Sequence, residues 1–420
     1  MNDQNFKSKT TQENHRIISI DVLRGLTILI MLFVNDLAGV ADVPGWLKHY
    51  QGANPDGMTF VDVVFPAFLF IVGMAIPFAI RKRLQNNQSY AQIWQHVLLR
   101  SFSLLVIGLF MVNSSYNNSD QGFLNPQVWT LLMYISIIFI WNTQSNRTSS
   151  VKKVMKVLKA VGIVLLAVLA VIHRGKGDPA FIEFQPMWWG ILGLIGWAYL
   201  VSCSSYISLR NNVLGLAGIM AILYSLYMAD SVAGPFLAFL RPWMNIGLFL
   251  CTHSAIIIAG ILLGIQLTPE SKYKTHIERI RWSFLYGLVL IIIGLLLHSL
   301  HDLDQVFTIS KNLATVPWGL ICSGIMAWVW LVVYWIIDIR GWRRWASFLS
   351  PAGKNPLFAY ILAPIVLVII SLVTQVFNIP NFYDRLGNNF IPGLIRSVVI
   401  AFAMVWLTGL LRRVGIRMKL

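Results

Sequence analysis

The feature that most constrains this chain is a succession of apolar runs, each about as long as a bilayer core is thick. A helix needs about 20 mostly apolar residues to cross the hydrocarbon core. Inside lipid, a backbone that is not paired with itself is too costly, so such runs form helices. The sequence therefore predicts an all-α, polytopic membrane helix bundle of about 12 transmembrane helices, at 17–38, 60–80, 97–113, 126–142, 156–173, 187–206, 212–229, 246–266, 283–300, 315–338, 355–377 and 391–411. The runs at 97–113 and 212–229 are the shortest, and counting them as re-entrant segments gives ten or eleven.

Composition and charge agree with a chain dissolved in lipid. Hydrophobic residues make up 57% of the 420 positions and charged residues only 12%, about half the charged share of a soluble domain. The net charge of +16 comes from short basic clusters between apolar runs, a distribution that sets membrane topology. We therefore expect no nucleic-acid partner. The three cysteines lie singly within apolar runs, which argues against a disulfide framework or a zinc site built on cysteine.

The basic residues predict which side of the membrane each loop occupies. With the N-terminus in the cytoplasm and twelve crossings, only seven of the 33 basic residues fall outside: Lys48, Arg174, Lys176, Arg241, Lys311, Arg385 and Arg396. Because Lys and Arg gather on the cytoplasmic side, both termini are predicted to be cytoplasmic, in the cell inner membrane. A cleaved signal peptide over 17–41 is the alternative, but Asp21 and Arg24 lie where it would be apolar. We expect a disordered N-terminus at 1–15, one transmembrane domain at 16–413 and a basic tail at 414–420.

The first helix carries ionisable side chains that a lipid-facing helix would not. Asp21 and Arg24 are three residues apart, so they share a face and can pair. The same stripe leads to Asn35, about 21 Å from Asp21 along the helix axis. Charged groups within membrane spans are functional candidates. The stripe is either a structural pair that locks this helix into the bundle or the wall of a polar cavity.

The loop after this helix holds a second candidate group. His49 lies between the first two predicted helices, and Asp62 follows in the first turn of the second. An imidazole oriented by a carboxylate is suited to general-base or nucleophilic work on an acyl group. A surface histidine, and a carboxylate that complements the helix dipole, are the simpler alternatives.

Two other histidine groups remain open. His298, His301, Asp302 and Asp304 lie near the outer end of a predicted helix, with a spacing that would allow a divalent metal. Polar side chains at a membrane boundary are the commoner reason for such a group, so no metal is expected. His253 falls within a span and is either a core histidine with its polar atoms satisfied or part of a cavity.

Several strings resemble one known family, the heparan-α-glucosaminide N-acetyltransferase family with its bacterial relatives. The first is Arg16-Ile-Ile-Ser-Ile-Asp21-Val-Leu-Arg24-Gly25, followed by Phe33-Val-Asn35. The second is Lys48-His49, then Thr59-x-x-Asp62-x-x-Phe65-Pro66-x-Phe68-x-Phe70-x-x-Gly73. Near the other end, Ser310-Lys-Asn-Leu313 opens a predicted helix that finishes Ile337-Asp-Ile-Arg-Gly341, and Gly353-Lys-Asn-Pro-Leu357 follows. This resemblance spans nearly the whole chain.

The resemblance implies a membrane-embedded transferase that moves an acetyl group from cytosolic acetyl-CoA to a sugar amine or hydroxyl across the membrane. It implies that His49, Asp62 and Asn35 are catalytic. Residues expected at the donor are Arg24, Asp21, Lys311, Asn312, Lys354, Asn355, Arg344 and His253. The family's Asp-Pro-Glu-Gly motif is replaced here by Arg241-Pro-Trp-Met-Asn-Ile-Gly247, a difference that bears on the acceptor.

The expected partners are acyl-CoA, a sugar or glycan acceptor and the lipid bilayer, and a homodimer is left open. A transporter or flippase of a sugar-lipid or small solute is the rival function. It suits the helix number and the intramembrane ion pair equally well. The lack of an internal repeat and a candidate site in an outer loop weigh against it.

Overall fold

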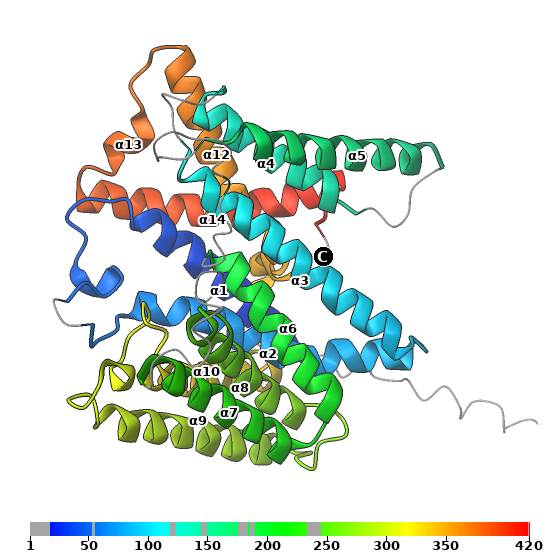
Figure 1. Ribbon diagram of the computed structural model, residues 1–420, viewed down its shortest axis with the longest axis vertical. Helices are drawn as coiled ribbons and strands as arrows, with labels where there is room; N and C mark the ends of the chain where they lie inside the picture. The colour runs from blue at the N-terminus through cyan, green and yellow to red at the C-terminus, as the bar shows by residue number, and fades with distance from the viewer. Residues whose placement is uncertain are drawn as a thin grey trace, which may run out of the picture.

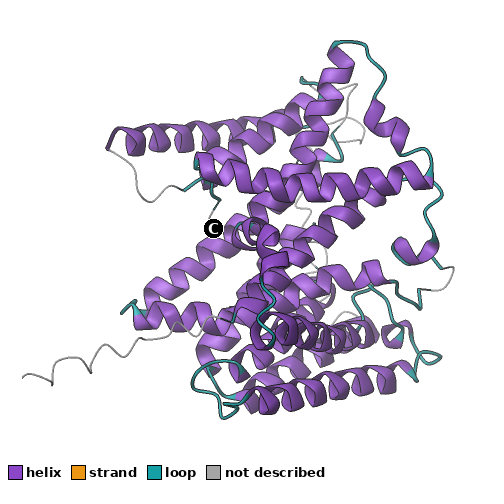
Figure 2. Cartoon of the chain, turned by 180° about the vertical axis from the view of Figure 1, so that it is seen from behind, coloured by secondary structure: helices purple, strands orange, loops and turns teal. Residues whose placement is uncertain are grey.

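The computed structural model describes residues 17–52, 55–117, 123–143, 149–174, 184, 190–232, 245–418 and 420, and these residues form helices and loops with no β-strand (Figure 2). Eleven of their helices are long and apolar enough to cross a membrane. The chain is therefore a multi-pass membrane protein with an all-α fold. The disorder expected at 1–15 and most of the string Arg241–Gly247 lie outside the described residues.

The apolar helices follow the twelve predicted runs closely. They are α1 (Ile18–Leu37), α2 (Phe60–Gln85), α3 (Tyr90–Ser114), α4 (Pro126–Trp141), α5 (Ser149–Ile172), α6 (Ile191–Leu209), α7 (Val213–Val232), α8 (Thr252–Gln266), α9 (His276–His298), α10 (Val316–Tyr334), α12 (Pro356–Val376) and α14 (Phe390–Val414). Two short helices, α11 (Ser350–Lys354) and α13 (Phe382–Leu386), lie between the last spans. Single π-helical turns at Gly247–Cys251 and Trp335–Ile339 extend α8 and α10.

The prediction of which runs are shortest was wrong. The runs at 97–113 and 212–229 belong to α3 and α7, which have 25 and 20 residues, whereas the short apolar helix is α4, with 16. The apolar run of α3 is shorter than its helix because polar first turns precede it. A capping box in which Ser89 and Gln92 each accept a backbone N–H at the start of α3 stabilises those turns.

A pair of helices in close contact, α2 and α8, lies at the core of the group that also contains α7 and α10. A Cβ atom at Gly73 would collide with the carbonyl of Ile257, and one at Gly260 with the carbonyl of Phe70. The two backbones therefore touch, as small residues allow between membrane helices. Every residue of α8 is buried, so this helix is enclosed by its neighbours along its whole length.

Helix α1 joins two groups of helices. In Figure 1, α4, α5, α12 and α14 lie in the upper part of the view and α2 and α7–α10 in the lower part. Helix α1 contacts α2 and α10 of the lower group and α11, α12 and α14 of the upper region. At its start, the N–H groups of Ile18 and Ser19 donate to the carboxylate of Asp338, at 3.2 and 3.0 Å. That side chain caps α1 from a part of the sequence about 320 residues away.

The two ends of α1 define the two ends of the bundle. The loop after α1, the loop before α10 and α13 lie on the same side, at the left of Figure 1. We call this side the His49 end. The opposite side, with the start of α1, α11 and the last turn of α14, is the Arg24 end. The described part of the predicted basic tail lies there, where Thr143 N–H donates to the carbonyl of Arg417 at 2.8 Å.

Candidate functional site

His49 and Asp62 form a direct contact at the His49 end. The distance from His49 Nδ1 to Asp62 Oδ1 is 2.8 Å. The other carboxylate oxygen accepts the backbone N–H groups of Tyr50 and Thr59, at 3.0 and 2.9 Å. Asp62 thus caps the first turn of α2 and holds the imidazole at the same time, so the two roles considered for this carboxylate exist together. Because a carboxylate only accepts, Nδ1 carries the proton and His49 Nε2 keeps its lone pair.

Lys311 reaches the same imidazole from the loop that joins α9 and α10. Its Nζ lies 3.0 Å from His49 Nδ1 and 3.1 Å from Nε2. Burial lowers the pKa of the Lys311 ammonium, and the charge of Asp62 partly opposes this shift. The cluster therefore places a cation with a weakened hold on its proton within hydrogen-bond distance of His49 Nε2, whose lone pair can accept from it.

The loop that carries Lys311 is a tight turn. Thr315 N–H donates to the carbonyl of Ser310 at 3.1 Å, and Ser310 N–H donates to Thr315 Oγ1 at 3.0 Å. The Tyr227 hydroxyl donates to the carbonyl of Leu313 at 2.7 Å. The string Ser310–Leu313 was expected to open a helix, but α10 begins only at Val316. Ala314 adopts a left-handed conformation, with φ at 51°, and this ends the turn before the helix starts.

A cavity of about 350 Å³ lies against these side chains. Five of the residues predicted from sequence line it: Asn35, His49, His253, Lys311 and Asn312. They come from α1, from two loops and from α8, so the fold brings together positions separated by more than 250 residues. Phe65, Phe249 and Trp318 supply part of its apolar wall. The arrangement combines an imidazole, an ammonium and an amide around a small, mostly apolar space.

His253 occupies the inner wall of this cavity. Its Nδ1 lies 3.1 Å from the carbonyl of Leu248, and a carbonyl only accepts, so Nδ1 carries the proton. The π-helical turn at Gly247–Cys251 brings that carbonyl within reach, and such turns are frequent at functional sites. The rings of Phe65 and Trp318 lie 5.5 and 6.2 Å from the imidazole. His253 is both a histidine bonded within the core and a cavity residue, so the two alternatives are compatible.

A second, larger cavity lies on the other side of Asn35. Its volume is about 590 Å³, and it is lined by residues of α1, α3, α4, α6 and α12. Tyr116, Tyr134, Tyr360 and Thr130 bring hydroxyl groups and aromatic rings to its wall. Asn35 lines both cavities, so this amide lies at the partition between them.

The Arg24 end holds the remaining residues that were predicted to bind the donor. Arg24 and Asp21 form the expected pair, 3.4 Å apart, and Arg24 also donates to the carbonyl of Gly353 at 3.2 Å. Arg344 and Lys354 are exposed nearby on the segment that contains α11. The amide of Asn355 is buried, and neither of its polar atoms has a hydrogen-bond partner in the described part of the chain. A buried amide left without a partner costs about 1–3 kcal/mol, which makes this position a candidate ligand contact.

The predicted donor residues therefore occupy two separate places. Lys311, Asn312 and His253 lie at the His49 end, and Asp21, Arg24, Arg344, Lys354 and Asn355 at the Arg24 end. Arg24 and Asn35 are about 16 Å apart along α1, from the rise of the helix. Only a long ligand would contact both groups at once. Arg81, in the last part of α2, is paired with Glu270 at 2.6 Å.

Sequence reasoning missed a buried ion pair beside the site. Arg396 Nε of α14 lies 3.2 Å from Asp36 Oδ2, and the Ser397 hydroxyl donates to the same oxygen at 2.6 Å. Both charged side chains are almost fully buried. Arg396 was counted among the few basic residues outside, although it lies within the last span. A lone arginine inside a span needs a partner, so the sequence signals that a buried pair exists but does not identify Asp36 as its other member.

Comparisons with known proteins find one family and two curated relatives. A family model described as "Domain of unknown function (DUF5009)" matches residues 16–264. The human protein named heparan-alpha-glucosaminide N-acetyltransferase is 35% identical over 101 residues, which are 24% of this chain and 14% of that protein. The mouse protein of the same name is 33% identical over 102 residues, 24% of this chain and 15% of that protein. The match thus spans about a seventh of the length of these curated relatives.

Proposed function

The chain belongs to the DUF5009 family, and from that premise we propose that it is a membrane-embedded acyltransferase. It takes an acetyl group from cytosolic acetyl-CoA and delivers it to a sugar amine or hydroxyl on the opposite side of the membrane. The observation that carries the proposal is the contact of His49 with Asp62 on the wall of a cavity shared with Asn35 and Lys311.

The reaction uses His49 Nε2, the ring nitrogen that does not bond to Asp62. The acceptor nitrogen or oxygen attacks the thioester carbonyl while His49 Nε2 takes its proton. The new C–N or C–O bond forms, the C–S bond breaks, and the proton held by the imidazole passes to the departing CoA sulfur. Asp62 keeps the proton on Nδ1 and so keeps Nε2 ready. An acyl-histidine route would use the same Nε2 atom as the nucleophile.

The charge that develops on the carbonyl oxygen has two candidate partners. Lys311 Nζ lies within 3.1 Å of the imidazole nitrogen that faces the reaction, and the Asn35 amide lines the same space. Fixed donors in a site shielded from water stabilise an oxyanion strongly. We assign this role to Lys311 and Asn35 together, with Phe65, Phe249 and Trp318 forming the apolar wall of the space around them.

The donor is proposed to approach from the Arg24 end. The basic clusters support an orientation in which that end, and both termini, face the cytoplasm, with the protein in the inner membrane. Exposed Arg344 and Lys354 are suited to the phosphates of CoA, since Arg and Lys bind phosphate through charge-assisted hydrogen bonds. Asn355 offers a buried amide to a polar group of the donor. The acyl end would then extend along α1 toward His49.

The acceptor is proposed to bind mainly in the larger cavity, with its reacting amine or hydroxyl extending past Asn35 into the cavity of His49. A sugar presents hydroxyl groups and an apolar ring face, and the cavity offers tyrosine rings and hydroxyls to both. Asn35 on its partition would lie between acceptor and donor. The two curated relatives carry names that describe N-acetyl transfer to a glucosaminide, and this supports an amino sugar as the first acceptor to test.

The test is direct transfer with purified protein. The chain is incubated with labelled acetyl-CoA and either glucosamine or glucose, and labelled sugar is measured beside the thermal midpoint with CoA. We expect CoA to raise the midpoint, because a ligand that binds only the folded state stabilises it, and acetyl transfer to follow. No stabilisation by CoA or acetyl-CoA at millimolar concentration, together with no transfer, would overturn the proposal and favour the transporter.

The orientation is tested separately in cells. Cysteines introduced at Asn117 and Asn389, which lie at the His49 end, should react with an impermeant reagent added outside. Cysteines at Asn86 and Ser149, at the Arg24 end, should stay unlabelled until the cells are opened. The reverse pattern would place the His49 end in the cytoplasm and contradict the proposed direction of transfer.

A further inference from the structure

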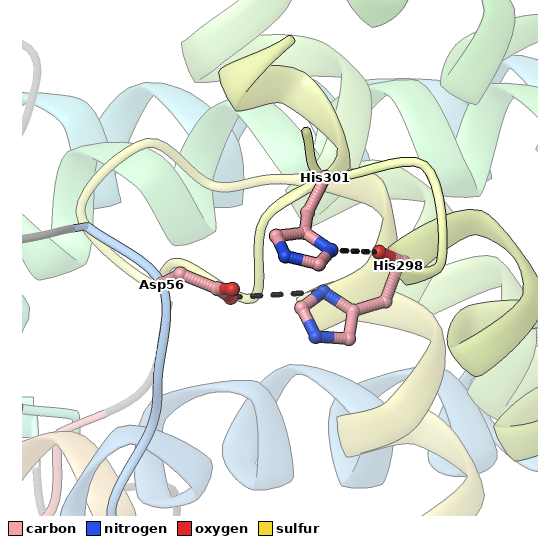
Figure 3. A group of neighbouring side chains, drawn as sticks. All are labelled: Asp56, His298 and His301. Atoms are coloured by element: carbon pink, nitrogen blue, oxygen red, sulfur yellow. Dashed lines mark hydrogen bonds and ion pairs between the residues drawn. The ribbon is translucent and has the colours of Figure 1, made fainter. Parts of the chain in front are cut away.

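Three side chains from two loops meet at the His49 end, outside the cavity described above. Asp56 lies in the loop between α1 and α2, His298 is the last residue of α9, and His301 follows in the next turn. One ligand atom from each lies within 4.8 Å of the others. Figure 3 shows the carboxylate and both imidazoles turned toward one another.

We propose that Asp56, His298 and His301 hold a divalent transition-metal ion, with Zn²⁺ as the ion that fits best. His298 Nδ1 lies 3.6 Å from Asp56 Oδ1. Two ligands about 2.1 Å from a tetrahedral zinc ion lie about 3.4 Å apart, so this edge of the site needs almost no adjustment. Imidazole donors favour zinc over magnesium and calcium, which prefer oxygen.

Neighbouring backbone groups orient two of the three ligands. His301 Nδ1 lies 3.0 Å from the carbonyl of His298 and donates to it, which leaves His301 Nε2 as the coordinating atom. Ile309 N–H donates to Asp56 Oδ1 at 2.8 Å. Metal-binding side chains are commonly fixed by such outer contacts. His298 Nδ1 also lies 3.3 Å from the carbonyl of Phe307, and coordination would replace this contact.

The two imidazoles are also close enough to bind one ion. The rings of His298 and His301 stack with centroids 4.9 Å apart. Two imidazolium ions at that separation would repel each other, whereas neutral rings can share one metal ion. Asp302 Oδ1 lies 3.4 Å from His301 Nε2 and is highly exposed, so this carboxylate or a water molecule can complete four ligands.

The metal would brace the catalytic loops without taking part in the chemistry. None of its three ligands lines the cavity that contains His49. Asp56 lies seven residues after His49, and Gly57 N–H donates to the carbonyl of Ile309 at 2.8 Å, two residues before Lys311. An ion shared by Asp56 and the two histidines would fix the loop of His49 against the loop of Lys311.

The experiment measures Zn²⁺ binding to the full-length chain without an affinity tag, after chelation and removal of the chelator. Isothermal titration and metal analysis should give one Zn²⁺ per chain, and Zn²⁺ should raise the thermal midpoint. His298→Ala, His301→Ala and Asp56→Asn should each weaken binding by at least about 10-fold. His276→Ala is the matched control, because it removes a histidine from the opposite end of the same helix, and it should leave the affinity unchanged.

Two results would overturn the site. One is the absence of saturable binding at micromolar Zn²⁺, and the other is binding that survives both His298→Ala and His301→Ala. If His298→Ala does not fold, Zn²⁺ binding to His301→Gln tests the site instead. The ring of His301 is 41% exposed, so its loss should not unfold the chain. The readout involves neither CoA nor sugar, so a negative result here leaves the proposed acyl transfer untouched.

Discussion

The two ends of α1 differ in how far the charged side chains around them are exposed to solvent. At the His49 end, the side chains of Asp62, Asp36 and Arg396 are at most 6% exposed, and each bonds to fixed partners. At the Arg24 end, Asp21 and Arg24 are 25% and 22% exposed, and Arg344 and Lys354 reach solvent. Chemistry needs a lone pair held in one direction, which buried partners supply. Capture of a charged ligand needs cations that its phosphates can reach, which exposure supplies.

The sharpest way to break this comparison is to remove the proposed base, His49, from the His49 end. His49→Ala should lower acyl transfer by about 100-fold to 10,000-fold, the usual contribution of a general base. CoA should still raise the thermal midpoint of this variant, because the proposed phosphate contacts lie at the Arg24 end. The measurements are the rate of labelled sugar formation and the CoA-dependent thermal shift.

Lys48→Ala is the control for His49, since it changes the adjacent side chain, which does not line the cavity. It should keep most of the activity. Turnover of His49→Ala near that of Lys48→Ala would remove His49 from the mechanism. Loss of both turnover and the CoA response would instead give His49 a role in folding or in donor binding, and His253 would become the next candidate base.

A second test asks whether the charge of Lys311 at the His49 end contributes to acyl transfer. Burial lowers its pKa, so the ammonium loses its proton below the value of about 10.4 for free lysine. If the charge supports the oxyanion, activity falls as pH rises through this lowered pKa. Lys311→Arg should move the alkaline fall to higher pH, because a guanidinium keeps its proton. Lys311→Met should lower transfer by about 100-fold at every pH.

The alkaline limb of kcat/KM in wild-type protein and in Lys311→Arg is the quantity to compare. His49 remains in both proteins, so a shift in the limb belongs to position 311. Identical limbs would show that another group titrates there. Activity retained in Lys311→Met would leave Asn35 as the remaining oxyanion donor among the cavity residues named above.

A third test addresses the Arg24 end, where we expect a smaller effect. Arg344→Ala combined with Lys354→Ala should raise KM for acetyl-CoA by about 10-fold, since each removes one solvated phosphate contact. The turnover number should change little, because neither side chain approaches His49. Lys152→Ala combined with Lys153→Ala removes equal charge from the exposed start of α5 and should leave KM unchanged. Equal effects of the two double variants would reduce the donor site to general attraction.

The sequence predicted features that depend on neighbours along the chain. Apolar length located the helices, and the contact of His49 with Asp62 joins residues only 13 positions apart. Pairs that depend on tertiary packing were not predictable in this way. Asp36 and Arg396 are 360 positions apart, and Asp56 joins His298 and His301 only because two loops fold together. Lys311 was predicted as a site residue from the family resemblance. Its contact with the His49 imidazole depends on the turn that precedes α10, which the sequence did not predict.

The smallest expected effect concerns the start of α1, which lies at the Arg24 end. Asp338 accepts the N–H groups of Ile18 and Ser19, so it satisfies two donors that a helix start leaves unpaired. Asp338→Ala should lower the stability of the folded chain by about 1 kcal/mol, as for other lost N-caps. Asp338→Asn should cost less, because its amide oxygen still accepts one N–H while the charge that favours a helix N-terminus is lost. Transfer at saturating acetyl-CoA should stay near normal in both variants, because Arg396 holds the other end of α1 through Asp36. Thermal unfolding in detergent, with the order wild type, Asn, Ala, is the measurement. The contrary result is an Asp338→Ala variant that unfolds at the same temperature as wild-type protein and still loses turnover. That result would show that the two ends of α1 are coupled and that the proposed separation of binding from chemistry along this helix is wrong.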